Sequence, residues 1–273
     1  MTTMAASTLI DEPYDLDGSA IDRFRRDGFV KLREVLSPEA INHYGPEITR
    51  KVFELNTETL PVAERDAFRA AFLQVMNLWR SSEFVREFVF SRRLARIAAE
   101  LMGVRSVRLY HDQALYKEAG GGGTPWHADH YYWPLATLNT CTVWVPLQRT
   151  PLEMGPLSFS VGSHQADLGR ELPISERSEA QISAELEGRD LPYIEDPYDL
   201  GEVSYHHGWT FHRAPQNTTD EARRVMTIIY VDADATISEP KNDEQRNDLE
   251  RWLAPARPGE AIGGPLNPVL YAA

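Results

Sequence analysis

Apolar residues recur at three- and four-residue steps through the first hundred positions, a spacing that predicts amphipathic helices. The first predicted helix ends at Gly28, and a short strand, Phe29–Leu32, follows it. A second begins at Ser37, where serine caps the helix and a proline opens its first turn. The same spacing predicts helices over 63–79 and 82–102. We expect these helices to serve as packing elements.

Beyond residue 104 the pattern changes to short runs rich in Val, Ile, Tyr, Thr and Trp, separated by Gly, Pro and Asn clusters. No helix of crossover length intervenes, so the runs favour an antiparallel barrel or jelly roll over a parallel sheet. The predicted strands cover 107–117, 141–147, 157–161, 203–206 and 223–231. The expected fold is therefore mainly β with helical support.

The same change of pattern suggests the domain organisation. Residues 1–20 are expected to form a loosely packed arm, and 21–273 a single domain. Within that domain we expect helical support over about 21–103, a jelly-roll core over about 104–235 and a C-terminal extension over about 236–273. The charged segment 165–200 is expected to lie over one mouth of the barrel, and Gly120–Gly123 to form a mobile hinge or lid edge.

Composition excludes several classes of function. The 273 residues include 28 Lys+Arg and 41 Asp+Glu, and the net charge of −13 argues against nucleic acid as a partner. No run approaches the ~20 apolar residues of a membrane-spanning helix, and the N-terminus lacks a signal-peptide pattern. The single cysteine, Cys141, excludes an intrachain disulfide and a cysteine-based zinc site. We expect a cytoplasmic monomer or homodimer that acts on a small molecule.

Candidate metal ligands stand in two segments. Trp126-His127-Ala128-Asp129 places an imidazole and a carboxylate two residues apart, and on a strand such residues share a face. A third ligand is suggested within His206 to Asn217, which contains three histidines. Two histidines and one carboxylate leave three positions of an octahedron open, as non-haem Fe(II) requires to bind a co-substrate and O₂. A catalytic zinc with one open position fits the same residues.

An arginine follows at the start of the last predicted strand. Arg223 lies eleven residues past His212. Its guanidinium can fork onto a carboxylate through two parallel hydrogen bonds, which suits the distal carboxylate of a dicarboxylate whose other end chelates the metal. Strand alternation turns Arg224 the other way, and a one-residue shift of register would exchange the two roles.

Together these features resemble the phytanoyl-CoA dioxygenase family of Fe(II)- and 2-oxoglutarate-dependent oxygenases, over roughly residues 28–231. The resemblance rests on segments in the family's order: Phe24-Arg25-Arg26-Asp27-Gly28-Phe29, His111-Asp112-Gln113, Trp126-His127-Ala128-Asp129, Thr142-Val143-Trp144-Val145-Pro146-Leu147, Gly155-Pro156-Leu157, Gly162-Ser163-His164, and His212 to Asn217 followed by Arg223.

The resemblance implies a double-stranded β-helix core and a defined set of site residues. Iron would be held by His127, Asp129 and His212, and 2-oxoglutarate by Arg223 with help from Gln113 and Trp144. No catalytic residue beyond the metal centre is implied. The chain departs from the family's common pattern at Arg213-Ala214 and at Glu153-Met154-Gly155-Pro156. The retained aspartate argues against the halogenating relatives, in which a small residue replaces it.

The implied reaction couples decarboxylation of 2-oxoglutarate by O₂ to hydrogen abstraction from an unactivated C–H bond. Hydroxylation, cyclisation and epimerisation are all open outcomes, and a role in antibiotic or other natural-product biosynthesis is expected. Two other functions also stay open. One is a zinc or iron hydrolase or isomerase that does not use 2-oxoglutarate, and the other is a non-catalytic jelly-roll binding module.

Aromatic residues adjoin the metal motif. Tyr131, Tyr132 and Trp133 follow it directly, and a loop beside the iron would place them on the substrate. Other polar and apolar candidates are assigned less direct roles. His206 and His207 are interpreted as strand residues, His130 and His164 as structural or pocket-lining residues, and Leu73, Met76, Asn77 and Trp79 as core residues that could instead close the pocket.

Overall fold

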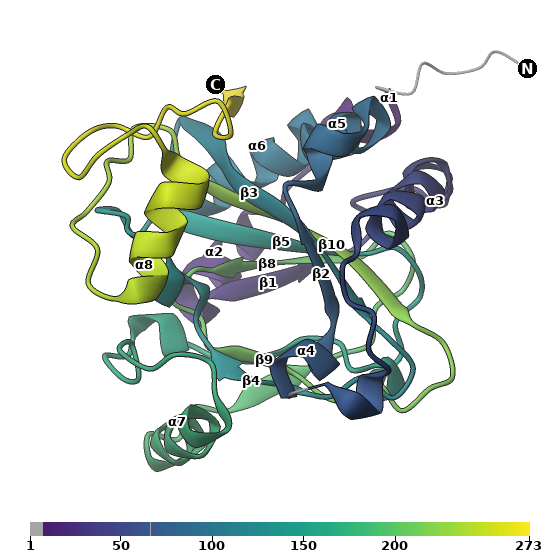
Figure 1. The fold of residues 1–273 in the computed structure, drawn as a ribbon. Coiled ribbons are helices and arrows are strands. Elements are labelled where there is room, and N and C mark those ends of the chain that lie inside the picture. The colour runs from purple at the N-terminus through teal and green to yellow at the C-terminus, as the bar shows by residue number, and fades with distance from the viewer. Residues whose placement is uncertain (1–7, 66) are drawn as a thin grey trace, which may run out of the picture.

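Two antiparallel sheets pack face to face in the computed structural model, which describes residues 8–65 and 67–273 (Figure 1). The larger sheet runs β1-β8-β5-β10-β3-β11 with β2 also paired to β3, and the smaller runs β4-β9-β6-β7. The strands are β1 (Phe29–Leu32), β2 (Leu73–Met76), β3 (Ser106–Lys117), β4 (Thr124–His127), β5 (Thr140–Pro146), β6 (Ser158–Ser160), β7 (Tyr193–Glu195), β8 (Val203–His207), β9 (His212–Ala214), β10 (Arg223–Asp232) and β11 (Val269–Ala272). Phe29 of β1 stacks on Phe159 of β6 with ring centroids 4.6 Å apart, so the sheets enclose an apolar layer. The predicted jelly-roll core with helical support is confirmed.

Helices cover the outer face of the larger sheet, where α6 packs across β3, β5 and β10. The α-helices are α1 (Thr8–Asp11), α2 (Gly18–Asp27), α3 (Pro38–Leu55), α4 (Ala67–Ala71), α5 (Glu83–Val89), α6 (Arg92–Met102), α7 (Glu176–Gly188) and α8 (Asp243–Asp248). Short helical turns are η1 (Val62–Glu64), η2 (Leu78–Ser81), η3 (Asp129–Tyr132), η4 (Leu152–Met154), η5 (Ser163–Gln165) and the π-turn η6 (Leu249–Leu253). Within the described residues, none of the helices has the length and apolar character needed to cross a bilayer.

The predicted helix ends near the N-terminus are confirmed in detail. Gly28 ends α2 in the left-handed region at φ 85°, where only glycine is free of strain. Ser37 caps α3 by accepting a hydrogen bond from the Ala40 N–H, and Pro38 begins the helix. The five predicted strands also agree with β3, β5, β6, β8 and β10 to within one or two residues at most ends.

Two helix predictions were wrong. The stretch 63–79 is not one helix but η1, α4, β2 and η2, because β2 pairs with β3 and the sheet's hydrogen bonds outweigh helical spacing. The stretch 82–102 divides into α5 and α6 at Ser91. The Ser91 hydroxyl caps α6 at the Leu94 N–H and donates to the Ile10 carbonyl, so the break also anchors the N-terminal segment.

The expectation of a loosely packed arm does not hold for residues 8–20. Ile10 is buried among the helices, and the Asp11 carboxylate accepts a hydrogen bond from the Arg92 N–H. Ala20 on α2 is also buried. Residues 1–7 of the predicted arm lie outside the described part of the chain.

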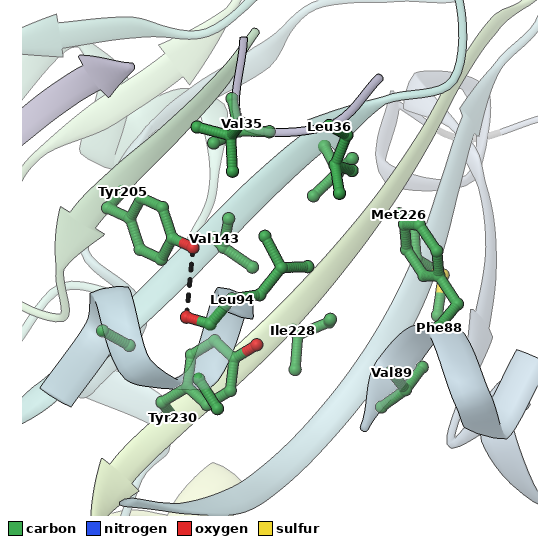
Figure 2. Close-up of a cluster of buried hydrophobic side chains, with 14 of the residues drawn as sticks. Val35, Leu36, Phe88, Val89, Leu94, Val143, Tyr205, Met226, Ile228 and Tyr230 are labelled. Carbon is green, nitrogen blue, oxygen red and sulfur yellow. Dashed lines mark hydrogen bonds between the residues drawn. The ribbon is translucent and has the colours of Figure 1, made fainter. Parts of the chain in front are cut away.

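The main core lies between the larger sheet and the helices that cover it (Figure 2). Leu94 of α6 is fully buried there, and its carbonyl accepts a hydrogen bond of 3.1 Å from the Tyr205 hydroxyl of β8. Met226, Ile228 and Tyr230 of β10 join this cluster. Since side chains alternate along a strand, the odd-numbered residues of β10 point to the opposite face, toward the space between the sheets.

We expect Leu94→Ala to lower the free energy of unfolding by about 2–5 kcal/mol, because it removes buried methyl groups and leaves a cavity. Leu138→Ala is the matched control, since Leu138 is 58% exposed, and should change that free energy by less than ~0.5 kcal/mol. Urea unfolding followed by circular dichroism measures both. Equal losses in the two variants would contradict the location of the core.

Candidate metal centre and co-substrate pocket

Three side chains converge where the smaller sheet meets the cavity between the sheets. His127 ends β4, His212 begins β9, and the antiparallel register of these strands sets the two directly opposite each other. Asp129 follows at the first position of η3. Its Oδ1 lies 3.8 Å from His127 Nε2 and 3.7 Å from His212 Nε2. The three ligand atoms lie within 4.8 Å of one another, a spacing that could hold one metal ion.

The orientation of each imidazole is set by its other nitrogen. His127 Nδ1 donates to the Pro125 carbonyl at 2.7 Å, and His212 Nδ1 donates to the Thr210 carbonyl at 3.0 Å. A carbonyl only accepts, so each Nδ1 carries the proton and each Nε2 turns a lone pair toward Asp129. Burial lowers the pKa of both histidines to about 4, which keeps them neutral at pH 7.

The second oxygen of Asp129 is held from the larger sheet. Thr142 Oγ1 donates to Oδ2 at 2.9 Å, and His206 Nε2 lies 3.2 Å from the same atom. Thr142 on β5 and His206 on β8 are cross-strand partners. Although burial opposes it, nearby His212 and the hydrogen bond from His206 lower the pKa of Asp129 below its ordinary value. Asp129 therefore presents one oxygen, Oδ1, to the two histidines.

The donor set fits a divalent transition metal. Two neutral Nε2 atoms and one carboxylate oxygen face one another at distances too long for hydrogen bonds among them. Such a set of two imidazoles and one carboxylate suits Fe(II) and leaves coordination positions for other ligands. The fit depends on the tautomers of His127 and His212 and on the hydrogen bonds that hold the Asp129 carboxylate. Both are set by the protein itself.

The remaining histidines lie outside this set. His206 is a strand residue as interpreted, but its side chain reaches Asp129, a role that the sequence interpretation missed. Alternation along β8 could have indicated it, because His206 and Ser204 share one face. His130 contacts Thr140, His164 contacts the Arg25 carbonyl, and His207 accepts from the Trp209 N–H.

A cavity of about 380 Å³ extends from the three candidate ligands along the inner face of the larger sheet. Arg223, Gln113 and Trp144 line it together with His127, Asp129 and His212. Arg224 instead lines a separate surface pocket with Thr49. The alternation of β10 is the reason, since Arg223 shares the inner face with Thr227 and Ile229.

Unpaired donors mark one end of this cavity. Arg223 is 2% exposed, its guanidinium lies 5.4 Å from the centre of the Trp144 ring, and one of its nitrogens, Nη1, donates to the Gly155 carbonyl. Arg223 Nε and Trp144 Nε1 are both buried without a hydrogen-bond partner. Burial lowers the pKa of Arg223 only to about 10, so it stays charged at pH 7. Buried donors of this kind suit a carboxylate ligand.

Both departures from the family's pattern are visible here. Arg213 turns out of the cavity onto Trp126 and Tyr193, at 4.8 Å from each ring centre, while Ala214 lines the cavity and offers no hydroxyl. Gly155 stands at φ 68°, and a Cβ there would overlap the Pro215 carbonyl oxygen. Its own carbonyl holds Arg223, so this turn positions the guanidinium.

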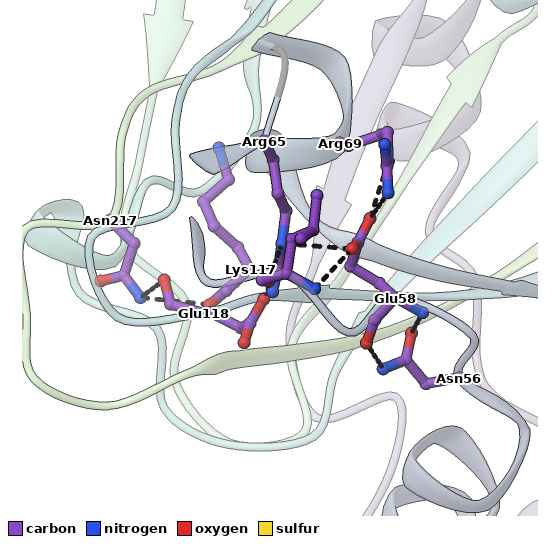
Figure 3. A network of polar contacts seen from close by, with 8 residues as sticks. Asn56, Glu58, Arg65, Arg69, Lys117, Glu118 and Asn217 are labelled. Atoms are coloured by element: carbon purple, nitrogen blue, oxygen red, sulfur yellow. Dashed lines mark hydrogen bonds and ion pairs between the residues drawn. The ribbon is translucent and has the colours of Figure 1, made fainter. Parts of the chain in front are cut away.

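One buried lysine, Lys117 at the end of β3 (labelled in Figure 3), joins the segments that flank the histidine-bearing strands. Lys117 Nζ donates to the carbonyls of Gly122 at 2.6 Å, just before β4, and of Pro215 at 2.7 Å, just after β9. Burial, then the nearby Arg223, lower its pKa to about 6. The N–H groups of residues 120–122 all donate to main-chain carbonyls, so this part of the glycine tract forms a hydrogen-bonded turn. The mobile hinge or lid edge expected there stays a prediction. No separate pattern in the sequence indicated this role of Lys117.

The predicted aromatic pocket residues take different positions. Tyr132 and Trp133 line the cavity, whereas Tyr131 is not among its lining residues and its carbonyl accepts from Gln245 Nε2 at 3.0 Å. Met76 also lines the cavity, while Leu73 packs in the main core. From the predicted cover, 165–200, Ile174 reaches the cavity, and Glu179 of α7 accepts from the Trp126 N–H.

Known proteins are similar to this chain in sequence and in fold. The family model of phytanoyl-CoA dioxygenase matches residues 24–225. The zebrafish phytanoyl-CoA dioxygenase domain-containing protein 1 (Danio rerio) is 30% identical over 137 residues, and the match spans 47% of this chain and 46% of that protein.

Two solved structures cover nearly the whole chain. The non-haem, α-ketoglutarate-dependent carbocyclase SnoK from nogalamycin biosynthesis is 28% identical with a TM-score of 0.75, covering 94% of this chain and 98% of its own. The epimerase SnoN, in complex with Fe³⁺, α-ketoglutarate and nogalamycin RO, is 27% identical with a TM-score of 0.75, covering 93% and 98%.

We expect the metal-free protein to lose stability as the pH falls from about 6.5 toward 4. Burial lowers the pKa of His111, His127, His207 and His212 to about 4 and of His130 to about 3. Between these values and ~6.5, the unfolded chain binds protons that the folded chain does not, so the free energy of unfolding decreases with decreasing pH.

Urea unfolding at pH 7, 6 and 5 measures this effect. The slope should exceed ~1.4 kcal/mol per pH unit, the value for a single proton. Equal free energies of unfolding at pH 7 and pH 5 would contradict the burial of neutral imidazoles.

Proposed function

The chain belongs to the phytanoyl-CoA dioxygenase family of non-haem iron, 2-oxoglutarate-dependent enzymes, and from that premise we propose that it oxidises an unactivated C–H bond of a small organic substrate. One observation carries the proposal: a single cavity holds both the His127–Asp129–His212 group and the unpaired donors of Arg223 and Trp144. The outcome would be hydroxylation, cyclisation or epimerisation.

In this proposal each site residue has a defined task. His127, Asp129 and His212 hold the iron, and Arg223 binds the distal carboxylate of 2-oxoglutarate with help from Gln113 and Trp144. When bound, iron and 2-oxoglutarate supply the oxidising chemistry, which consumes O₂ and releases succinate and CO₂. Thr142 and His206 occupy the second oxygen of Asp129, which favours binding through one oxygen and leaves positions free for the co-substrate and O₂.

The cavity also limits competing chemistry. Tyr132 and Trp133 line the side away from Arg223, where Trp133 packs against Tyr110, and they offer the substrate a largely apolar wall. Such a wall orients the target carbon and excludes water from the site. The protein thus contributes binding and orientation, while the cofactor and co-substrate contribute the oxidation.

Similarity to a carbocyclase and an epimerase of nogalamycin biosynthesis supports a role in natural-product tailoring. A metal-dependent hydrolase or isomerase without 2-oxoglutarate explains less of the site. It would leave Arg223 Nε and Trp144 Nε1 buried without a partner, at a cost of about 1–3 kcal/mol for each unsatisfied group. A non-catalytic binding module would not need the restrained tautomers of His127 and His212.

Oxygen admission to the anaerobic protein tests the proposal directly. Protein loaded with Fe(II) and 2-oxoglutarate is mixed with a panel of candidate substrates, and succinate is measured after O₂ is admitted. We expect succinate formation that a true substrate stimulates and that Asp129→Ala abolishes. If no compound in a broad panel stimulates succinate formation, the proposed oxidation is contradicted.

A pair of conservative variants tests the co-substrate end. Arg223→Lys should weaken 2-oxoglutarate binding by about tenfold or more, because a lysine lacks the planar fork that meets a carboxylate with two hydrogen bonds. Arg224→Lys should change the affinity by less than about twofold, since Arg224 lies in the other pocket. Anaerobic titration of the visible Fe(II)–2-oxoglutarate charge-transfer band measures both affinities. A larger effect in Arg224→Lys would reverse the assignment.

A further inference from the structure

The end of the cavity opposite Arg223 is closed by the C-terminal segment. Glu244 and Asp248 of α8 and Arg251 of η6 line it there. Glu244 and Asp248 stand four residues apart, so they share one face of the helix. Gln245 Nε2 donates to the carbonyl of Tyr131 in η3, so this segment is tied to the turn that begins at Asp129. The two carboxylates are thus held over the cavity as part of its wall.

Asp248 is held in place by two hydrogen-bond donors. Its Oδ2 accepts a hydrogen bond of 2.8 Å from the Tyr110 hydroxyl, and the Trp252 indole also hydrogen-bonds to the carboxylate. Burial nevertheless raises the pKa of Asp248 to about 7, against the effect of these two donors. Asp248 is therefore only partly ionised at pH 7, and a cation beside it would favour its charged form, as nearby Arg251 already does in part. Glu244, four residues earlier, is exposed at the same mouth.

One buried ring nitrogen in this region lacks a hydrogen-bond partner. His111 is 4% exposed, lines the cavity, and its Nδ1 has no hydrogen-bond partner. The ring lies 5.8 Å from that of Trp252 and is close enough to Asp129 to interact with its charge. His111 therefore lies between the metal ligands and the Asp248 wall, where a substrate would offer it a hydrogen bond.

With Asp248 ionised, the charge of this wall is negative overall. Apart from the metal and co-substrate groups, two carboxylates line the cavity against one guanidinium, and Arg251 lies 5.4 Å from the centre of the Trp252 ring. The whole chain carries −13. The charge of the wall and the net charge of the chain both attract cations and repel anions that enter from this side.

We propose that the substrate carries a protonated amine on an apolar or aromatic skeleton, and that Glu244 and Asp248 bind the ammonium. This inference rests on the proposed function and names its substrate class. The aromatic wall of Tyr132 and Trp133 receives the skeleton, while the ammonium lies at the C-terminal wall. An anionic substrate meets two carboxylates instead, so a phosphorylated or carboxylated molecule is excluded from this position.

Three probes of one skeleton test the proposal: benzylammonium, benzyl alcohol and benzoate. Each is titrated by calorimetry into the full chain loaded anaerobically with Fe(II) and 2-oxoglutarate. We expect benzylammonium to bind about tenfold or more tightly than benzyl alcohol, as a charge-assisted hydrogen bond permits, and benzoate to bind most weakly. The preference should shrink as salt is raised, because Glu244 is exposed.

Amide variants of the two carboxylates test whether Glu244 and Asp248 cause the preference for benzylammonium. Glu244→Gln with Asp248→Asn should abolish the preference for benzylammonium and leave benzyl alcohol unchanged; asparagine still offers Tyr110 an acceptor. Glu250→Gln is the matched control, because it removes one charge from an exposed residue that does not line the cavity, and it should keep the preference.

The outcomes separate this inference from the proposed function. Equal binding of the amine and the alcohol, no binding of benzylammonium, or a preference that survives in the double variant overturns the amine assignment. The charge-transfer band of Fe(II) with 2-oxoglutarate is recorded in the same samples. If that band fails to form, the proposed function fails instead, irrespective of the probes.

Discussion

The pairing of β4 with β9 is the contact on which the site depends. Its register sets His127 opposite His212, and Lys117 holds the outer ends of both strands through the carbonyls of Gly122 and Pro215. A buried amine that donates to two strand ends is a strong restraint, because water cannot compete for its hydrogen bonds there. The separation of the two imidazoles follows from this small piece of sheet.

The larger sheet supplies the restraints that complete the site. Thr142 and His206, paired across β5 and β8, hold one oxygen of Asp129, and β10 carries Arg223 into the cavity. The smaller sheet therefore positions the metal ligands, and the larger sheet orients them and supplies the anion-binding end. A jelly roll suits this division because its two inner faces meet around one cavity.

Electrostatics divide the cavity into two ends. Arg223 provides a buried cation at one end, although the chain as a whole carries −13. The C-terminal helix α8 provides carboxylates at the other end. A dianionic co-substrate and a cationic substrate would then be sorted by local charge, since potentials inside a cleft depend on the nearest buried groups more than on net charge. The same cavity also explains why its histidines are neutral: burial disfavours their charged form.

The class of fold, the family and the residue types of the candidate site could be predicted from the amino-acid sequence. Alternation indicated the strands, Gly28 and Ser37 marked helix ends, and the His127–Asp129 spacing with His212 and Arg223 indicated the chemistry, because these signals are local. Tertiary structure decided the rest. It divided 63–79 to build β2, docked residues 8–20, turned Arg223 inward and Arg224 outward, and brought His206, Lys117 and Asp248 to the site. Those outcomes depend on pairing between distant strands, and strand pairing is set by packing and hydrogen bonds that no local pattern contains.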